Sequence, residues 1–176
     1  HTCGYIEYLN LNKKALGYFE KSLKLREELG DKKRITATLG LMGETYLKLG
    51  YPEKAIEYYS KDLEMLKEIN DKATQAVIYD NLGTCYDNQA NYKEALVAYQ
   101  IALPLYEETG KKSEAARVIS NIAGIYSKTG RIGLSLDYHQ KAIKIRATVN
   151  DQIGLAYSIN NIGVIYSNNG DIINAL

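Results

Sequence analysis

The sequence has 176 residues, 45% of them hydrophobic and 24% charged, and its 22 Lys and Arg side chains nearly balance 21 Asp and Glu side chains. This composition is typical of a soluble globular protein. A formal net charge of +1 gives no basis for a nucleic-acid or anionic-membrane surface, because such surfaces need clustered Lys and Arg. The aromatic residues are uneven, with 16 Tyr, one Phe and no Trp.

The two cysteines, Cys3 and Cys85, lie far apart without a CxxC spacing or a companion His cluster. The sequence therefore predicts neither a disulfide framework nor a zinc site, but two small, buried or half-buried thiols. No run approaches the roughly 18 apolar residues of a membrane span. No basic-then-apolar signal segment opens the chain, which slightly favours the cytoplasm. We predict no metal, no cofactor, no nucleic-acid partner and no direct membrane contact.

A shift of 40 residues brings like residues onto like along the whole chain, which indicates an internal repeat. The most regular position is a tyrosine, found at Tyr46, Tyr86, Tyr126 and Tyr166. A small residue stands three positions earlier, at Gly43, Gly83, Ala123 and Gly163. Another stands nine positions later, at Ala55, Ala95, Ser135 and Ala175.

Each period carries two apolar stripes at helical spacing, so we predict pairs of antiparallel helices of about 17 residues. Glycine or asparagine ends these helices, and Gly50 and Gly130 suit a left-handed helix end. Pro52 suits the first turn of a helix. Aspartates are expected to cap the helices that follow the other joints, at Asp31, Asp71 and Asp151.

In chain order, we predict one array made of a partial repeat over 1–30, full repeats over 32–70, 72–110 and 112–150, and a truncated repeat over 152–176. Stacked helix pairs bury a continuous core that a single pair could not, which predicts an all-α solenoid. The chain begins at His1 and ends one turn into a second helix. We interpret it as a fragment of a longer protein whose truncated ends could self-associate.

The order of large apolar residue, Leu or Ile, Gly or Ala, Tyr, then Gly, Ala and an aromatic residue resembles the tetratricopeptide repeat. The residues that carry this resemblance are Tyr79, Leu82, Gly83, Tyr86, Ala95, Tyr99, Ile119, Ile122, Ala123, Tyr126 and Gly130. The period of 40 exceeds the family's usual one of about 34. With its longer period, the sequence resembles the branch of the family that is found in spindle-orientation scaffolds, kinesin light chains, Rap-type bacterial regulators and sensory segments of some bacterial histidine kinases and cyclases. The resemblance implies a right-handed α-solenoid whose concave face, lined by first helices, binds a peptide or protein segment.

Helical geometry places one set of side chains on the arc of each first helix opposite its packed stripe. We call this surface the groove arc, and it comprises Ala37, Leu41, Glu44 and Lys48, then Val77, Asn81, Thr84 and Asn88, then Arg117, Asn121, Gly124 and Lys128, and finally Tyr157, Asn161, Val164 and Asn168.

Three asparagines, Asn81, Asn121 and Asn161, recur at one position of the groove arc. A primary amide both donates and accepts, so such a row can bind the backbone of an extended peptide. The alternative is that these amides bond neighbouring helices or water. Leu41 would instead form an apolar pocket. Arg117, Lys128 and Lys48 would pair with ligand carboxylates or remain solvated.

The sequence offers no catalytic arrangement, because only His1 and His139 are present and no Ser-His-Asp, HExxH or paired-carboxylate site can be assembled. His139 and the tyrosines of the second helices are expected to pack in the core, with each phenol keeping its hydroxyl at the edge. We predict a non-catalytic scaffold that binds a protein or peptide. The alternative is a sensory or oligomerising segment of a larger bacterial signalling protein, such as a histidine kinase, a cyclase or a transcription regulator.

Overall fold

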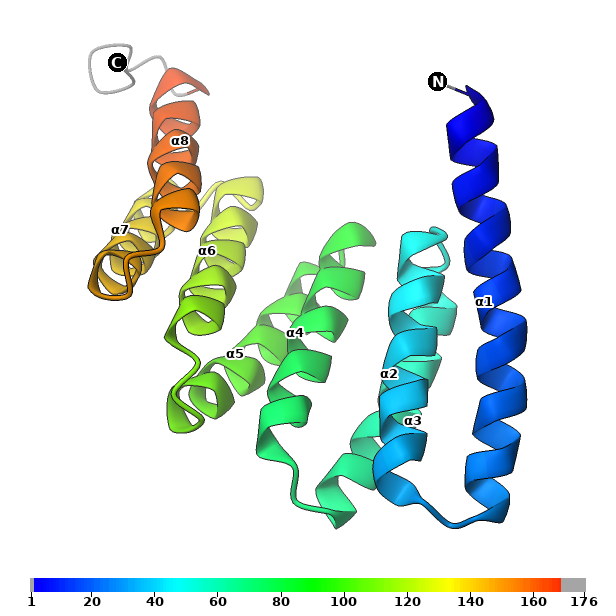
Figure 1. The fold of residues 1–176 in the computed structure, drawn as a ribbon. Coiled ribbons are helices and arrows are strands. Elements are labelled where there is room, and N and C mark those ends of the chain that lie inside the picture. Colours follow the sequence, from blue (N-terminus) through cyan, green and yellow to red (C-terminus); the bar gives the residue numbers. More distant parts are fainter. Residues whose placement is uncertain (1, 169–176) are drawn as a thin grey trace. The chain divides into compact units, whose positions relative to one another are not determined.

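The computed structural model describes the backbone of residues 2–168 and the side chains of residues 10–168. These residues form eight α-helices (Figure 1): α1 (Thr2–Glu28), α2 (Lys32–Lys48), α3 (Pro52–Glu68), α4 (Lys72–Asn88), α5 (Tyr92–Glu108), α6 (Lys112–Lys128), α7 (Ile132–Thr148) and α8 (Gln152–Asn168). The predicted helix length is confirmed, since α2 to α8 have 17 residues each. Only α1, with 27 residues, is longer. The all-α class is therefore confirmed for the part of the chain that the structure describes.

The helices fall into two compact units, His1–Asn91 and Tyr92–Leu176. In the first unit each of α1 to α4 packs on its neighbours in the chain, and α2 also contacts α4. In the second unit α5 to α8 pack in the same way, and α6 also contacts α8. The boundary lies between α4 and α5, inside the repeat expected over 72–110, so the repeat bounds remain predictions.

The predicted N-caps are confirmed. Asp31 Oδ1 accepts a hydrogen bond from the backbone N–H of Arg34 at 3.1 Å, and Asp71 Oδ1 accepts one from Thr74 at 3.0 Å. Asp151 Oδ1 does the same for Gly154 at 2.9 Å. Each cap satisfies one of the backbone donors that a helix start leaves unpaired.

The helix ends also follow the prediction, with one unexpected residue. Gly50 and Gly130 adopt φ values of 78° and 74°, and Asn70 and Asn150 adopt 53° and 55° at the other joints. At the joint after α4 the same left-handed conformation falls on Ala90, with φ of 58°. A β-carbon makes this conformation unfavourable, so Ala90 is strained where the equivalent residues are glycines.

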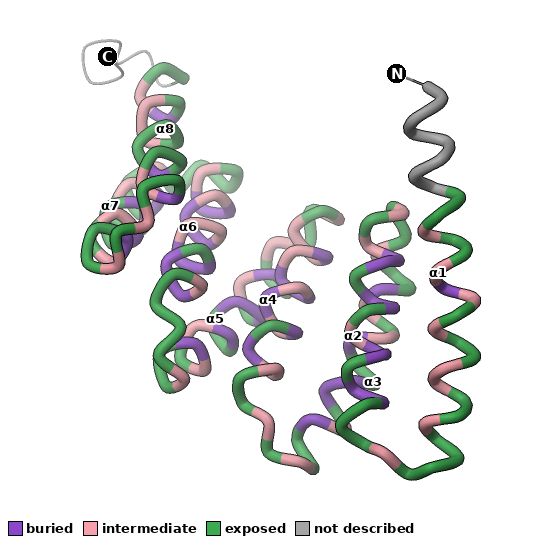
Figure 2. The backbone as a smooth tube through the Cα atoms, viewed as in Figure 1, coloured by how far each residue is buried: buried purple, intermediate pink, exposed green. Residues whose placement is uncertain are grey.

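Apolar residues of the two helices in a pair form the core, and Figure 2 shows buried positions (purple) along both α2 and α6. Gly43 of α2 sets the approach of α3, because a β-carbon there would lie 2.5 Å from Cε1 of the Tyr59 ring. Beside this contact, the rings of Tyr46 and Tyr58 stack with centroids 5.2 Å apart. The predicted packing role of the tyrosines is confirmed for these residues.

Two expectations about individual side chains have different outcomes. The imidazole of His139 is buried, as predicted for an aromatic packing position. The expectation that every phenol keeps its hydroxyl at the edge of the core is wrong for Tyr59, whose Oη is buried without a hydrogen-bond partner. Burial raises the pKa of Tyr59 well above its usual value, so the phenol stays neutral. None of the helices within residues 2–168 combines the length and apolar character that a membrane span requires.

Candidate peptide-binding surface

The groove arc remains accessible in both units. On α2 and α4, Leu41 and Val77 are 46% and 42% exposed, which is unusual for large apolar residues. On α6 and α8, Asn121 is half-buried and Asn161 is exposed. The opposite stripe is mainly buried on α2, α4 and α6, as at Met42, whereas on α8 it is half-buried or exposed. For α2, α4 and α6 the observed burial therefore agrees with helical geometry about which side of the helix faces its partner.

Asn81 differs from the other two asparagines in a side-chain interaction with a neighbouring helix. It is half-buried on α4, and its amide approaches the Tyr59 hydroxyl of α3 without forming a hydrogen bond of normal geometry. This approach lowers the pKa of Tyr59 slightly against the larger rise that burial causes. The contact favours the alternative interpretation for Asn81, in which the amide is directed at a neighbouring helix.

Three polar residues of the groove arc in the first unit, Glu44, Lys48 and Thr84, interact within their own helices. Lys48 Nζ lies 2.6 Å from Glu44 Oε1, in an ion pair whose side chains are about half exposed. Thr84 Oγ1 donates to the backbone oxygen of Asp80 at 3.1 Å. Asn88 is exposed at the last residue of α4. A ligand carboxylate at Lys48 would compete with Glu44, although an exposed pair of this kind is easily exchanged.

In the second unit the groove arc is basic and aromatic. Arg117 and Lys128 are exposed on α6, and Lys128 Nζ lies 6.0 Å from the centroid of the Tyr92 ring. Between them, Gly124 leaves open space, since a β-carbon there would meet nothing within 4 Å. On α8, Tyr157 and Asn168 are exposed. This unit therefore offers amides, cations and one phenol to a ligand.

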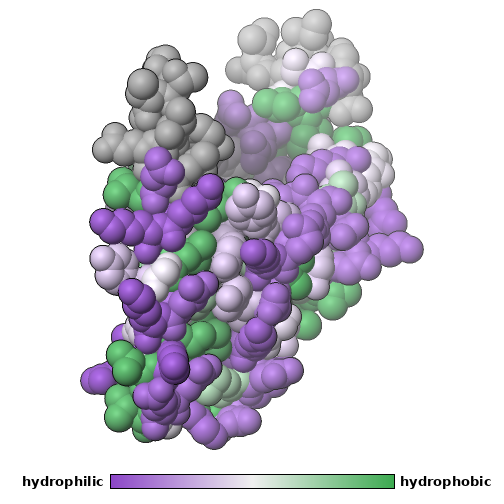
Figure 3. Space-filling view, turned by 90° about the vertical axis from the view of Figure 1, so that its right-hand side faces the viewer, coloured by the Kyte–Doolittle hydropathy of each residue, from purple (hydrophilic) through white to green (hydrophobic). Residues whose placement is uncertain are grey.

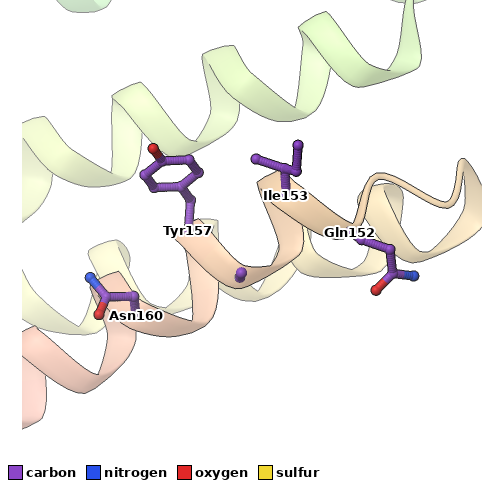
Figure 4. A pocket seen from close by; sticks show the side chains of 5 residues that line it. Gln152, Ile153, Tyr157 and Asn160 are labelled. Atoms are coloured by element: carbon purple, nitrogen blue, oxygen red, sulfur yellow. The ribbon is translucent and has the colours of Figure 1, made fainter.

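Sequence reasoning missed a cavity of about 480 Å³ beside α8, whose described lining residues all come from that helix (Figure 4). Tyr157 belongs to the groove arc, whereas the other lining residues, Gln152, Ile153, Ala156 and Asn160, do not. A second cavity, of about 360 Å³, lies among α5, α6 and α7 and is lined by Glu107, Lys112, Ala115, Lys144, Ile145 and Thr148. Ile153 was the residue in the sequence that could have indicated the first cavity, because it is apolar and the structure leaves it exposed.

The described Cys and His side chains, Cys85 and His139, are buried in the core and lie outside the groove arc. Among the described side chains of residues 10–168, no three or more His, Cys, Asp or Glu gather in a group that could hold a metal ion. Burial raises the pKa of the Cys85 thiol to about 12, which keeps it protonated and unreactive. Burial and the nearby Arg146 lower the pKa of His139, so its imidazole is neutral and enclosed. The side chain of Cys3 lies outside the described residues.

The repeated helix pairs of this chain match a known protein family. Tetratricopeptide repeat models match residues 34–108 and 115–152, which together cover more than half of the sequence. The chain belongs to the tetratricopeptide repeat family. Domains of this family are typically protein-binding modules and are generally non-catalytic. No curated protein sequence matches the chain significantly.

Solved structures with the same tetratricopeptide fold are similar at low sequence identity. BtubC from P. vanneervenii matches with a TM-score of 0.82 and 22% identity, over 93% of this chain and 68% of that one. A Rap protein complexed with competence and sporulation factor gives 0.81 and 20%, over 95% and 46% of the two chains. The signal-transduction ATPase PH0952 from Pyrococcus horikoshii, which has a tetratricopeptide repeat sensor, gives 0.76 and 22%, over 97% and 27%. The chain thus spans less than half the length of the last two proteins.

Proposed function

We propose that this tetratricopeptide repeat chain binds a protein or peptide segment along its groove arc, with Asn121 and Asn161 contacting the backbone of the ligand. The observation that supports this most is that Asn161 is exposed on α8 and Asn121 is partly exposed on α6, two helices that contact each other directly. Each amide can donate to a ligand carbonyl and accept from a ligand N–H. Such contacts bind an extended segment without requiring a particular sequence.

The two units contribute different chemistry to this binding. The first unit presents the apolar side chains of Leu41 and Val77, which would accept an aliphatic or aromatic side chain of the ligand. The second unit presents Arg117 and Lys128, which would favour acidic ligand residues. Asn81 contributes less, because its amide is directed at Tyr59. The Rap protein that is complexed with competence and sporulation factor shares this fold, which supports the same use of it here.

A second candidate function is a sensory or oligomerising segment of a larger signalling protein. The similarity to the signal-transduction ATPase PH0952, a protein with a tetratricopeptide repeat sensor, favours it, because this chain covers only 27% of that larger protein. The two functions are compatible, since a sensor must also bind a ligand. They differ in whether ligand binding changes the activity of an attached domain.

A peptide-display selection tests the binding function with random peptides as the probe. The peptides are selected on the wild-type chain, and their affinity is then measured for the Asn121→Ala/Asn161→Ala variant. We expect an affinity loss of about tenfold or more, because the ligand backbone loses its hydrogen-bond partners. The control is Glu57→Ala/Lys61→Ala, which removes an exposed ion pair on α3 outside the groove arc. Unchanged affinity in a folded amide variant would refute the role of these asparagines.

A further inference from the structure

The last described helix, α8, exposes positions that equivalent first helices bury. Ile159 is 56% exposed, whereas Leu39 of α2 and Ile119 of α6, at the same repeat position, are only 4% and 5% exposed. Gly163, Tyr166 and Ile162 nearby are half-buried. In α2 these positions pack on the second helix of the pair, at Gly43 and Tyr46 for example. The pairing face of α8 is therefore uncovered among the described residues.

The first helix of the chain, α1, has the sequence of a second helix and exposes the complementary face. Tyr18 is 62% exposed, whereas the equivalent Tyr58 stacks on Tyr46. Phe19 is half-buried, whereas the equivalent Tyr59 is completely buried against Gly43. Among the described side chains of α1, the exposed large apolar residues are Leu11, Tyr18 and Leu25, and Leu29 follows directly after the helix. Figure 3 views the molecule from the side of α1 and shows apolar patches (green) among hydrophilic side chains.

The exposed faces of α8 and α1 carry the residues that correspond to the two sides of the α2–α3 contact. Gly163 of α8 stands where Gly43 receives the Tyr59 ring, and Phe19 of α1 stands in the place of Tyr59. Likewise Tyr166 and Tyr18 occupy the positions of the stacked pair in α2 and α3. In addition, α8 contains no Asp, Glu, Lys or Arg over Gln152–Asn168, so burying it would desolvate no charge.

We propose that a second copy of this chain covers the two faces, so that α1 of one copy packs on α8 of the next and forms the helix pair that α2 and α3 form within the chain. Each copy uses a different face for its two neighbours, so the contact is heterologous and the copies join head to tail. Phe19 of one copy lies on Gly163 of the other, and Tyr18 stacks on Tyr166. This interface uses the pairing stripes and leaves the groove arc open, so it is independent of the proposed peptide binding.

Two variants that each block one face test the proposal on the full 176-residue chain. Phe19→Glu places a charge on the α1 face, and Ile159→Glu places one on the α8 face. The molar mass in solution is measured by light scattering over a range of concentrations. We expect the mass of the wild type to rise with concentration beyond that of a dimer. Each variant alone is expected to remain monomeric, whereas an equimolar mixture gives a dimer, because one functional face of each kind remains.

The matched control is Leu134→Glu, which puts the same charge at an exposed apolar residue of α7 outside both faces. This control should associate like the wild type, and circular dichroism should show that all three variants are folded. If Phe19→Glu unfolds, Tyr18→Lys replaces it. A wild type that is monomeric at every concentration would overturn the proposal. A monomer that associates only after deletion of residues 169–176 would also overturn it, by showing that the chain's own end covers α8.

Discussion

Arg146 joins α7 to α8 through a hydrogen bond of 2.7 Å from its guanidinium to the hydroxyl of Ser158. It also donates to the backbone oxygen of Gly154, and its Nε lies 3.6 Å from Asp151 Oδ2. Gly154 leaves room for the guanidinium, because a β-carbon there would lie 2.7 Å from Arg146 Nε. The buried arginine is thus held by three groups at the start of the next helix.

The same arrangement recurs at the other end of the chain. Arg26 of α1 donates to the backbone oxygen of Arg34 at 2.9 Å and to the hydroxyl of Thr38. In the repeats between, the corresponding pairs of residues are apolar, namely Leu66 with Ile78 and Tyr106 with Val118, and all four are buried. The position is therefore filled either by a hydrogen-bonded polar pair or by an apolar pair.

Exchanging the polar pair for the apolar pair tests this interpretation. Arg146→Leu should reduce the free energy of unfolding by about 2–4 kcal/mol, because buried hydrogen-bond partners on α8 lose their donor. Ser158→Ile should also destabilise, since it leaves the buried guanidinium without that acceptor. The double variant should recover most of the loss. Urea denaturation measures all three, and purely additive effects would contradict the pairing.

Because Gly43 contacts the Tyr59 ring, replacing it with alanine should change stability in the opposite direction to the same replacement at Gly17. Gly43→Ala should destabilise by about 1–3 kcal/mol, because the new methyl group would lie 2.5 Å from a ring carbon and force the helices apart. Gly17→Ala on α1 is the control, since a β-carbon there meets nothing within 4 Å. It should stabilise by about 0.5–1 kcal/mol through helix propensity. Thermal unfolding distinguishes the two, and equal effects would contradict the close approach. Gly83→Leu, at the equivalent position of α4, is expected to be severely destabilising as well.

Asp62 predicts a pH dependence of stability in the first unit. Both of its carboxyl oxygens are buried without a hydrogen-bond partner, and burial, aided by the negative charge of Asp71, raises its pKa to about 7. A carboxyl whose pKa is raised by folding binds a proton more tightly in the folded state, so wild-type stability should fall as the pH rises from about 4 to about 7. The loss is on the order of 2–4 kcal/mol.

Asp62→Ala should remove this dependence, because Ala102 and Ala142 occupy the same position in other repeats and are buried there. The variant should be more stable than the wild type at pH 8 and differ little at pH 4. Urea midpoints at both pH values provide the measurement. A wild type that gains stability between pH 4 and 7 relative to Asp62→Ala would show that the carboxyl is ionised and paired.

The left-handed conformation of Ala90 predicts that Ala90→Gly stabilises the chain. The equivalent residues, Gly50 and Gly130, already relieve the strain of a positive φ. We expect the free energy of unfolding to rise by about 1 kcal/mol. The left-handed conformation costs a residue with a β-carbon roughly 1–2 kcal/mol. Part of this gain is offset because glycine loses more conformational entropy on folding. Gly50→Ala should give a loss of similar size. A lower melting temperature for Ala90→Gly would contradict the assigned conformation.

Most of the fold follows from local signals in the sequence. The 40-residue period indicates how often the helices recur, and the aspartate caps and the Gly or Asn ends mark where helices begin and end, because caps and ends act within one helical turn. The groove arc follows for the same reason, since one helix determines which residues share a side. Contacts between helices are harder to predict, and the partner of Arg146, the burial of Asp62 and the direction of the Asn81 amide depend on packing that no single helix encodes. Ala90 adopts a left-handed conformation that its own preference disfavours, so its backbone could not be predicted from the residue type.

Chemical-shift mapping of a selected peptide on the isotopically labelled chain tests the peptide-binding function most directly. The side-chain amide signals of Asn121 and Asn161 report on the groove arc, and the imidazole and backbone signals of α7 residues report on the second helices. Binding along the groove arc predicts saturable shifts of both asparagine side-chain amides, with smaller shifts on the exposed side of α7. Saturable shifts that are confined to exposed residues of the second helices, with both asparagine amides unchanged, would contradict it.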